Sequence, residues 1–399
     1  MTPIRDERTW RRWIAAAAFG AATANFVSIA AAHALLAAGL ALLLLRPRSV
    51  RVPPVAWPIA ALLAWTLVSA AASDAPAESL PQIKKFFVFA MLPLVYTAFR
   101  STDQCRRGAE AWFVVVLCAC ALALAQFGRS ALEVARGGGD FYSLYVDDRI
   151  TGFYSHWMTF SQSSALVLVT LACYLAFGRK RPGSGIWAVA GGMIACALLL
   201  SFTRSAWLAL LACGLYIVAV KKPRALAAIP VVLAVGYLAA PEPLRQRVRS
   251  IQPAANQSRI VMWRTGLNMI GAHPILGVGP ERAGPLFSAF QPRDVEELPP
   301  GFYGHLHNVY IHFAAERGIP AALIVLWLFG QVLLDMRVGL RRLSGFRDDR
   351  RFLLHAGVAG TLAVAILSCF DVSLGDSEVL GAFLALLAIA YRGIPEPAA

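Results

Sequence analysis

The chain has 399 residues, of which 58% are hydrophobic and 15% are charged, whereas an ordinary soluble domain has about 25% charged residues. Its formal net charge is +14, but the basic residues are spread between apolar runs rather than clustered on one helix. This composition excludes a soluble enzyme, a disordered protein and a nucleic-acid-binding module, and it predicts an all-α polytopic membrane protein.

Twelve apolar runs are predicted to cross the membrane, because a span needs about 20 apolar residues. The first run follows a basic stretch at 5–12, which would also fit a cleaved signal peptide. Since the apolar chain continues to Leu45, two spans with a tight turn near Asn25 fit better. The predicted spans are approximately 13–30, 31–45, 55–72, 83–99, 110–128, 157–177, 186–202, 204–220, 225–240, 319–336, 352–370 and 377–391.

Basic residues in the short loops set the orientation, since cytoplasmic loops are enriched in Lys and Arg. With a cytoplasmic N-terminus every short inner loop is basic, and both termini are then cytoplasmic. The sequence thus predicts an N-terminal membrane region of nine spans at 1–240 and an outer helical segment at 241–318. A C-terminal membrane region of three spans follows at 319–399.

The long outer segment has helical patterns of its own. Apolar residues recur along 260–270 at spacings of three, four and three, which predicts one amphipathic helix. A second short helix is predicted around 306–313 and is closed by Gly318 and Pro320. Loops of this length with their own structure are usually functional.

Histidines gather in the predicted outer segments, and His305 and His307 lie within the polar stretch Tyr303–Tyr310. An imidazole titrates near neutral pH and can serve as a general base. The alternative is that these side chains cap helices or form local hydrogen bonds. A metal site starting from His305-x-His307 is a third hypothesis, but no carboxylate lies at a familiar ligand spacing.

Arg204 lies at the outer end of two spans that are joined by almost no loop. An arginine at the membrane boundary is costly unless it has an anionic partner or extends to the interface. Because a guanidinium group matches phosphate oxygens in pairs, one hypothesis is a clamp for a diphosphate. The alternative is an interfacial anchor.

The stretch Ser258–Arg264 is a further candidate on the first outer helix. Arg259 and Trp263 are four residues apart and so share a helix face. Together they could hold a phosphate and stack on a sugar, with Arg264 beside them. A solvated arginine and an interfacial tryptophan would give the same pattern.

Weaker candidates lie on other outer turns. Arg149 is close to a Gly-Phe-Tyr stretch. The carboxylates Asp371, Asp376 and Glu378 follow the eleventh predicted span, where they could bind acceptor sugars or pair with the arginines. A plain solvated turn is the simpler explanation for them.

One motif resembles a known family signature. His307-Asn308, nine residues and then Gly318 is similar to the signature of the O-antigen ligase and polymerase superfamily. The family pattern continues with Gly, Thr or Tyr where this chain has Ala321, a departure at a packing position.

Two other stretches add to the resemblance. Arg204 and Leu208 resemble the family's Arg-x-x-x-Leu pattern, and 258–280 is similar to its periplasmic segment. These motifs occur in the family's order, on the same predicted side of the membrane and at similar spacing. The resemblance therefore extends over the whole predicted topology of about twelve spans, with a long outer segment between the ninth and tenth.

The resemblance implies a GT-C-like fold and a metal-independent, inverting glycosyltransferase without a cofactor. Its donor would be a glycan on undecaprenyl diphosphate and its acceptor lipid A–core, in the periplasm at the bacterial inner membrane. Membrane lipids are expected partners and nucleic acid is not. The implied catalytic residues are His307, Arg204 and Arg259, and the implied substrate-binding residues are Arg264, Trp263, His305, Tyr310 and Arg149.

Three alternatives stay open. The first is an O-antigen polymerase, in which the acceptor is another carrier-linked glycan. The second is a protein O-oligosaccharyltransferase, although those enzymes tend to have more periplasmic sequence after the histidine signature. The third is a flippase for lipid-linked glycan, which is disfavoured because the spans carry few charges.

Overall fold

The computed structural model describes residues 6–250, 256–343 and 348–395, so Arg5 of the basic N-terminal stretch lies outside it. All regular structure in these ranges is helical. The elements are α1 (Glu7–Ala24), α2 (Ile29–Leu45), η2 (Pro47–Ser49), α3 (Ala56–Ala71), α4 (Pro76–Ser79), η3 (Leu80–Ala90), α5 (Met91–Ala98), α6 (Thr102–Gly137), α7 (Phe141–Asp147), α8 (Trp157–Phe177), α9 (Ser184–Leu200), α10 (Arg204–Lys221), η4 (Pro223–Ala228), α11 (Ile229–Ala239), α12 (Glu242–Arg249), α13 (Gln257–Ala272), α14 (Phe287–Phe290), α15 (Val309–Arg342), α16 (Asp349–Leu367) and α17 (Ser377–Tyr391).

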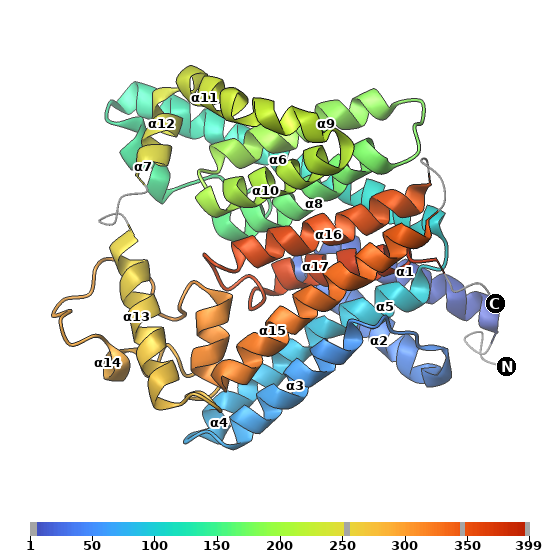
Figure 1. The fold of residues 1–399 in the computed structure, drawn as a ribbon, viewed down its shortest axis with the longest axis horizontal. Coiled ribbons are helices and arrows are strands. Elements are labelled where there is room, and N and C mark those ends of the chain that lie inside the picture. Colours follow the sequence, from blue (N-terminus) through green and yellow to red (C-terminus); the bar gives the residue numbers. More distant parts are fainter. Residues whose placement is uncertain (1–5, 251–255, 344–347, 396–399) are drawn as a thin grey trace.

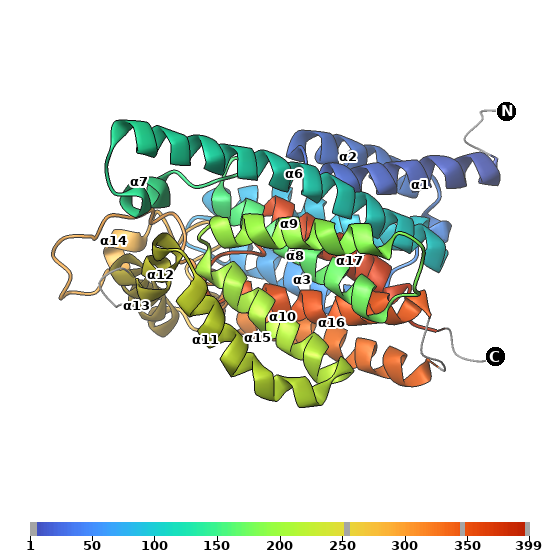
Figure 2. The same ribbon diagram turned by 90° about the horizontal axis from the view of Figure 1, so that it is seen from above.

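The helices form one elongated bundle with α8, α16 and α17 at its centre (Figures 1 and 2). These three helices are buried along most of their length. The surrounding helices expose large apolar side chains, for example Trp57, Ile186 and Leu238. An outer surface of this kind suits contact with lipid, in which helices satisfy their own backbone hydrogen bonds.

In the described part of the chain, five helices are long and apolar enough to cross a membrane, namely α6, α8, α10, α15 and α16. Shorter apolar helices of 10–17 residues lie at Ile29–Leu45, Ala56–Ala71, Ser184–Leu200, Pro223–Ala239 and Ser377–Tyr391. A multi-pass membrane protein is therefore supported, while the number of twelve spans stays a prediction. The turn expected near Asn25 is confirmed, since this residue caps the end of α1.

The structure departs from several predicted spans. The first predicted span runs to 30, but α1 ends at Ala24, and the ninth begins in the 3₁₀-helix η4. The run 83–99 is not one α-helix, because η3 starts with Pro81 and continues as a 3₁₀-helix to α5. The helix α6 continues through the predicted loop to Gly137. Its extension includes good helix formers such as Ala131, Leu132 and Ala135, and Arg129 pairs with Glu133 one turn later at 3.4 Å.

The helices α13 and α14 project from one end of the bundle, whereas α1 begins and α17 ends at the opposite end (Figures 1 and 2). The amphipathic helix predicted over 260–270 is confirmed as part of α13. It packs with the loops that follow it around a small separate hydrophobic core that includes Met269, Phe287 and Leu306.

A kink in α15 holds the outer segment against the bundle. Asn308 caps the first turn, and the helix is broken at Gly318, which has a φ of 77°. A Cβ at this position would collide with the carbonyl oxygen of Ile275. The amide of Ile319 donates to the carbonyl of Pro274 at 2.8 Å. The short helix and its predicted end at Gly318 are therefore confirmed.

Candidate functional site

A cavity of about 1140 Å³ lies at the end of the bundle from which α13 projects. Its walls come from η3, the loop before α8, the starts of α10 and α15, the helices α12 and α13, and the turn between α16 and α17. Segments far apart in the sequence thus contribute to one space. Five of the eight predicted site residues line it, namely Arg149, Arg204, Arg259, His305 and His307.

The other three predicted residues do not line the cavity. Trp263 is one turn beyond Arg259 on α13 and packs against the small outer core. Arg264 is exposed and pairs with Asp294 at 2.6 Å. The hydroxyl of Tyr310 donates to the carbonyl of Ala365 at 2.8 Å, which fixes α15 to α16.

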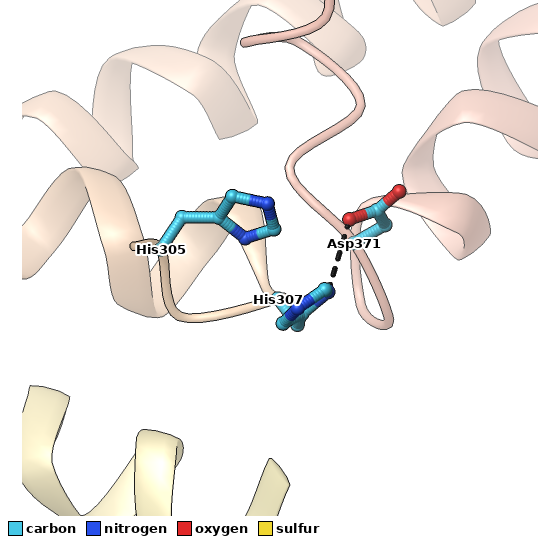
Figure 3. Close-up of side chains that lie close together, drawn as sticks. All are labelled: His305, His307 and Asp371. Atoms are coloured by element: carbon cyan, nitrogen blue, oxygen red, sulfur yellow. Dashed lines mark hydrogen bonds and ion pairs between the residues drawn. The ribbon is translucent and has the colours of Figure 1, made fainter. Parts of the chain in front are cut away.

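His307 is held next to a carboxylate from the turn between α16 and α17 (Figure 3). Its Nδ1 lies 3.2 Å from Oδ1 of Asp371, and the two side chains are only 16% and 13% exposed. The backbone of His307 has a φ of 46°, which a non-glycine residue adopts only where the surroundings enforce it. If Nδ1 carries the proton shared with Asp371, Nε2 is the basic nitrogen.

The charge states of the neighbouring groups support this arrangement. Burial raises the pKa of Asp371, but the hydrogen bond from His307 and the nearby imidazoles outweigh it and lower that pKa below its usual value. The carboxylate is therefore ionised at neutral pH. Burial, and then the charge of His307, lower the pKa of His305 to about 4, so this imidazole is neutral.

The same three side chains could also hold a metal ion. One ligand atom each from His305, His307 and Asp371 lies within 4.8 Å of the others (Figure 3). The buried Nδ1 of His305 has no hydrogen-bond partner in the described part of the chain. Two imidazoles and a carboxylate are a ligand set that zinc accepts. The structure thus supplies the carboxylate that sequence spacing does not reveal.

A wall of arginines forms another part of the cavity. None of the four makes an ion pair with a carboxylate among the described residues, in contrast to the exposed Arg264. Arg204 instead donates to the carbonyl of Ser250 at 2.6 Å and to Oδ1 of Asn256 at 2.9 Å. The members of this arginine wall are Arg149, Arg204, Arg247 and Arg259.

Two members of the arginine wall share a backbone acceptor. Arg247 donates to the carbonyl of Phe202 at 2.8 Å, and Arg149 does so at 3.4 Å. The guanidinium of Arg149 also lies 4.3 Å from the ring of Trp157. Burial, and then the charge of Arg247, lower the pKa of Arg149 to about 9. A bound anion would relieve this repulsion, since an opposite charge stabilises the protonated form.

Sequence reasoning missed several residues of the cavity. Arg247 belongs to a helix with other arginines, and composition alone does not tell which of them faces inward. Lys85 lines the cavity from η3 and pairs with Glu281 at 2.7 Å. Asp371 was noticed only as part of an acidic turn, because its pairing with His307 joins positions 64 residues apart.

A stretch of the chain that contributes to the centre of this site matches a known protein family. Residues 189–326 match the family model described as O-antigen ligase. This region runs from α9 into α15 and contains Arg204, Arg259 and His307. No curated protein matches the chain. Over residues 189–326 this helical membrane architecture is thus similar to the O-antigen ligase family.

Proposed function

We propose that the chain is an O-antigen ligase that joins O-antigen polysaccharide from undecaprenyl diphosphate to lipid A–core. The family that residues 189–326 match suggests a glycosyltransferase-like ligase or polymerase, acting on lipid-linked glycans at the membrane. The observation that carries the proposal is the shared cavity, which combines a histidine–carboxylate pair with four arginines that lack a carboxylate partner in the described chain.

The arginine wall suits the donor. When the glycosidic bond to the carrier breaks, the diphosphate leaves with growing negative charge that the enzyme has to stabilise. Guanidinium groups bind phosphate oxygens in pairs and keep their charge over the working pH range. We assign Arg204 and Arg259 to the diphosphate, with Arg149 as a further contact to the donor.

The histidine–carboxylate pair suits the acceptor. A sugar hydroxyl is a weak nucleophile, and a positioned base accelerates its attack by roughly 10²–10⁴-fold. In our proposal Nε2 of His307 takes that proton while Asp371 holds the ring and stabilises the imidazolium that forms. A single attack from the face opposite the diphosphate inverts the anomeric configuration. The route uses no metal or other cofactor.

The site has a defined place in the membrane in this proposal. Both termini are cytoplasmic, twelve spans form a GT-C-like membrane domain, and the cavity faces the periplasm. The segment 241–318 closes the cavity between the membrane regions 1–240 and 319–399. Three predicted substrate-binding residues stabilise this part of the structure from outside the cavity, namely Tyr310, Trp263 and Arg264. His305 lies on the acceptor side of the cavity.

A transfer assay with purified protein tests the proposal. The donor is a polyprenyl-diphosphate glycan, the acceptor is lipid A–core, and each reaction is run with and without EDTA. His307→Ala should lower the rate by roughly 10²–10⁴-fold, whereas His273→Ala, a histidine of the same segment outside the cavity, should not. EDTA should have no effect.

The other outcomes point to the alternatives. Longer carrier-linked chains in place of lipid A–core products would identify a polymerase. Transfer to a protein acceptor alone would identify an oligosaccharyltransferase. Loss of activity in EDTA would favour a metal bound by His305, His307 and Asp371 over His307 as the general base. Folded protein without any transfer would overturn the enzyme proposal in favour of a flippase.

A further inference from the structure

Phe302 is an unusual side chain for the wall of a polar cavity. It belongs to the loop between α14 and α15, lines the cavity, and is 65% exposed. The other large apolar residues of that wall, such as Met262 and Phe313, are buried or half-buried in the described structure. An exposed aromatic ring inside a binding cavity commonly marks a contact for a ligand.

The ring of Phe302 is held in place from one side. It lies against the backbone of Gly304, where an added Cβ would collide with the ring. The ring of His305 stands at its edge, with centroids 5.3 Å apart and an interplanar angle of 67°. The hydroxyl of Tyr303 donates to the carbonyl of Pro299 at 2.5 Å, which fixes the loop around the ring. The backbone of Gly304 and the ring of His305 therefore hold the far end of the Phe302 ring, while much of the side chain stays open to the cavity.

We propose that Phe302 is a stacking platform for a pyranose ring of the substrate glycan. This inference rests on the proposed glycan transfer. The face of an aromatic ring carries partial negative charge, and the C–H groups on one face of a pyranose carry partial positive charge. Stacking also removes the exposed ring from water. The fixed orientation lowers the entropic cost of binding, because the platform is already in place.

The position of the platform favours a sugar close to the reaction centre. Phe302 touches His305, whose ring centroid is 4.1 Å from that of His307. The sugar that stacks on Phe302 is thus at most one or two sugar units away from the glycosidic bond that forms. Both the sugar next to the donor diphosphate and the acceptor sugar meet this condition. The chemistry that Phe302 recognises is the same for both, and kinetics separate them.

The first test measures KM for donor and acceptor separately. Phe302→Ala should raise the KM of one substrate about tenfold, equivalent to about 1.4 kcal/mol, while kcat changes little. Phe302→Trp should keep the wild-type KM, and Phe302→Leu should not, because it is apolar but has no ring. Leu267→Ala is the matched control, since Leu267 is 57% exposed on α13 and does not line the cavity.

The substrate whose KM rises is the one that stacks on Phe302. Unchanged KM values for both substrates in Phe302→Ala would overturn the platform. So would an equally raised KM in the tryptophan variant, because that result would indicate a role in packing.

The second test does not depend on transfer. The fluorescence difference between Phe302→Trp and the wild type is followed during titration with soluble O-antigen or core oligosaccharide. A saturable change supports the platform even if the wild type transfers no glycan, in which case only the proposed function fails. No change with either oligosaccharide, in protein that transfers glycan, would overturn the platform while leaving the proposed function intact.

Discussion

Three non-glycine residues of the described chain have a left-handed backbone conformation, and all three border the cavity. His307 and Glu281 line it, and the carbonyl of Phe202 accepts from two members of the arginine wall. Such conformations cost free energy and persist where the surrounding structure enforces them, most often at functional sites. The backbone strain around the cavity is thus a second argument for a functional site, separate from the histidines and arginines from which the site was inferred.

The contact between His307 and Asp371 yields a prediction about turnover. Asp371→Asn keeps the size of the side chain but removes the negative charge that stabilises the imidazolium. We expect kcat to fall by at least about tenfold, with the KM of the donor little changed. Asp294→Asn, an exposed position outside the cavity, is the control. Full kcat in Asp371→Asn would contradict the assigned role of this carboxylate.

Burial of His305 predicts a loss of stability in mild acid. Its pKa is about 4 in the folded protein, mainly because of burial, and about 6.5 in an unfolded chain. Between these values the unfolded chain binds a proton that the folded chain does not, so stability decreases as the pH falls from about 6.5 towards 4. We expect the thermal midpoint in detergent to fall over this range in the wild type and to fall less in His305→Gln. Parallel curves for the two proteins would contradict the assignment.

At the scale of elements, the helices were largely predictable because a bilayer span has a clear signature in hydrophobicity. The ends were less predictable. Hydropathy places the end of the fifth span at Gly128, but the helix α6 continues because its next residues include good helix formers and an ion pair. The 3₁₀-helix η3 was missed because hydropathy does not distinguish a 3₁₀-helix from an α-helix.

The kink at Gly318 predicts a strong effect of one methyl group. Gly318→Ala places a Cβ against the carbonyl of Ile275 and at a φ of 77°, which alanine tolerates poorly. We expect a loss of about 1–3 kcal/mol or more of stability, measured by thermal unfolding in detergent. Gly330→Ala is the control in the same helix, because no atom lies within 4 Å of its added Cβ. Equal stability of the two variants would show that the kink does not depend on glycine.

At the scale of the molecule, the candidate site could be predicted only in part. Arg204 stands out because it lies at the end of an apolar span, whereas Arg259 and His307 were identified by helix spacing and by the resemblance to a family signature. The pairing of His307 with Asp371 and the inward position of Arg247 depend on packing between distant helices. No periodicity carries that information. Trp263 was wrongly predicted to lie in the site. It is one helical turn from Arg259, but it packs against the small outer core instead of lining the cavity.

The orientation of the whole molecule is tested by cysteine labelling. In a variant without native cysteines, Asp294→Cys lies in the outer segment and Arg107→Cys at the start of α6, and both side chains are more than half exposed. A membrane-impermeant maleimide should label Asp294→Cys in intact spheroplasts and Arg107→Cys only after lysis, since the proposed topology places the basic loops in the cytoplasm. The opposite pattern would invert the topology and place the cavity in the cytoplasm.

The central claim is that one cavity holds the donor diphosphate on the arginine wall and places the anomeric carbon of the donor next to the base His307. The most direct measurement is a structure of the purified protein with a non-transferable polyprenyl-diphosphate sugar analogue. The account predicts the diphosphate within hydrogen-bonding distance of Arg204 and Arg259, with the anomeric carbon on the side of His307. A diphosphate bound outside the cavity, or within it but away from the arginine wall, would contradict the account.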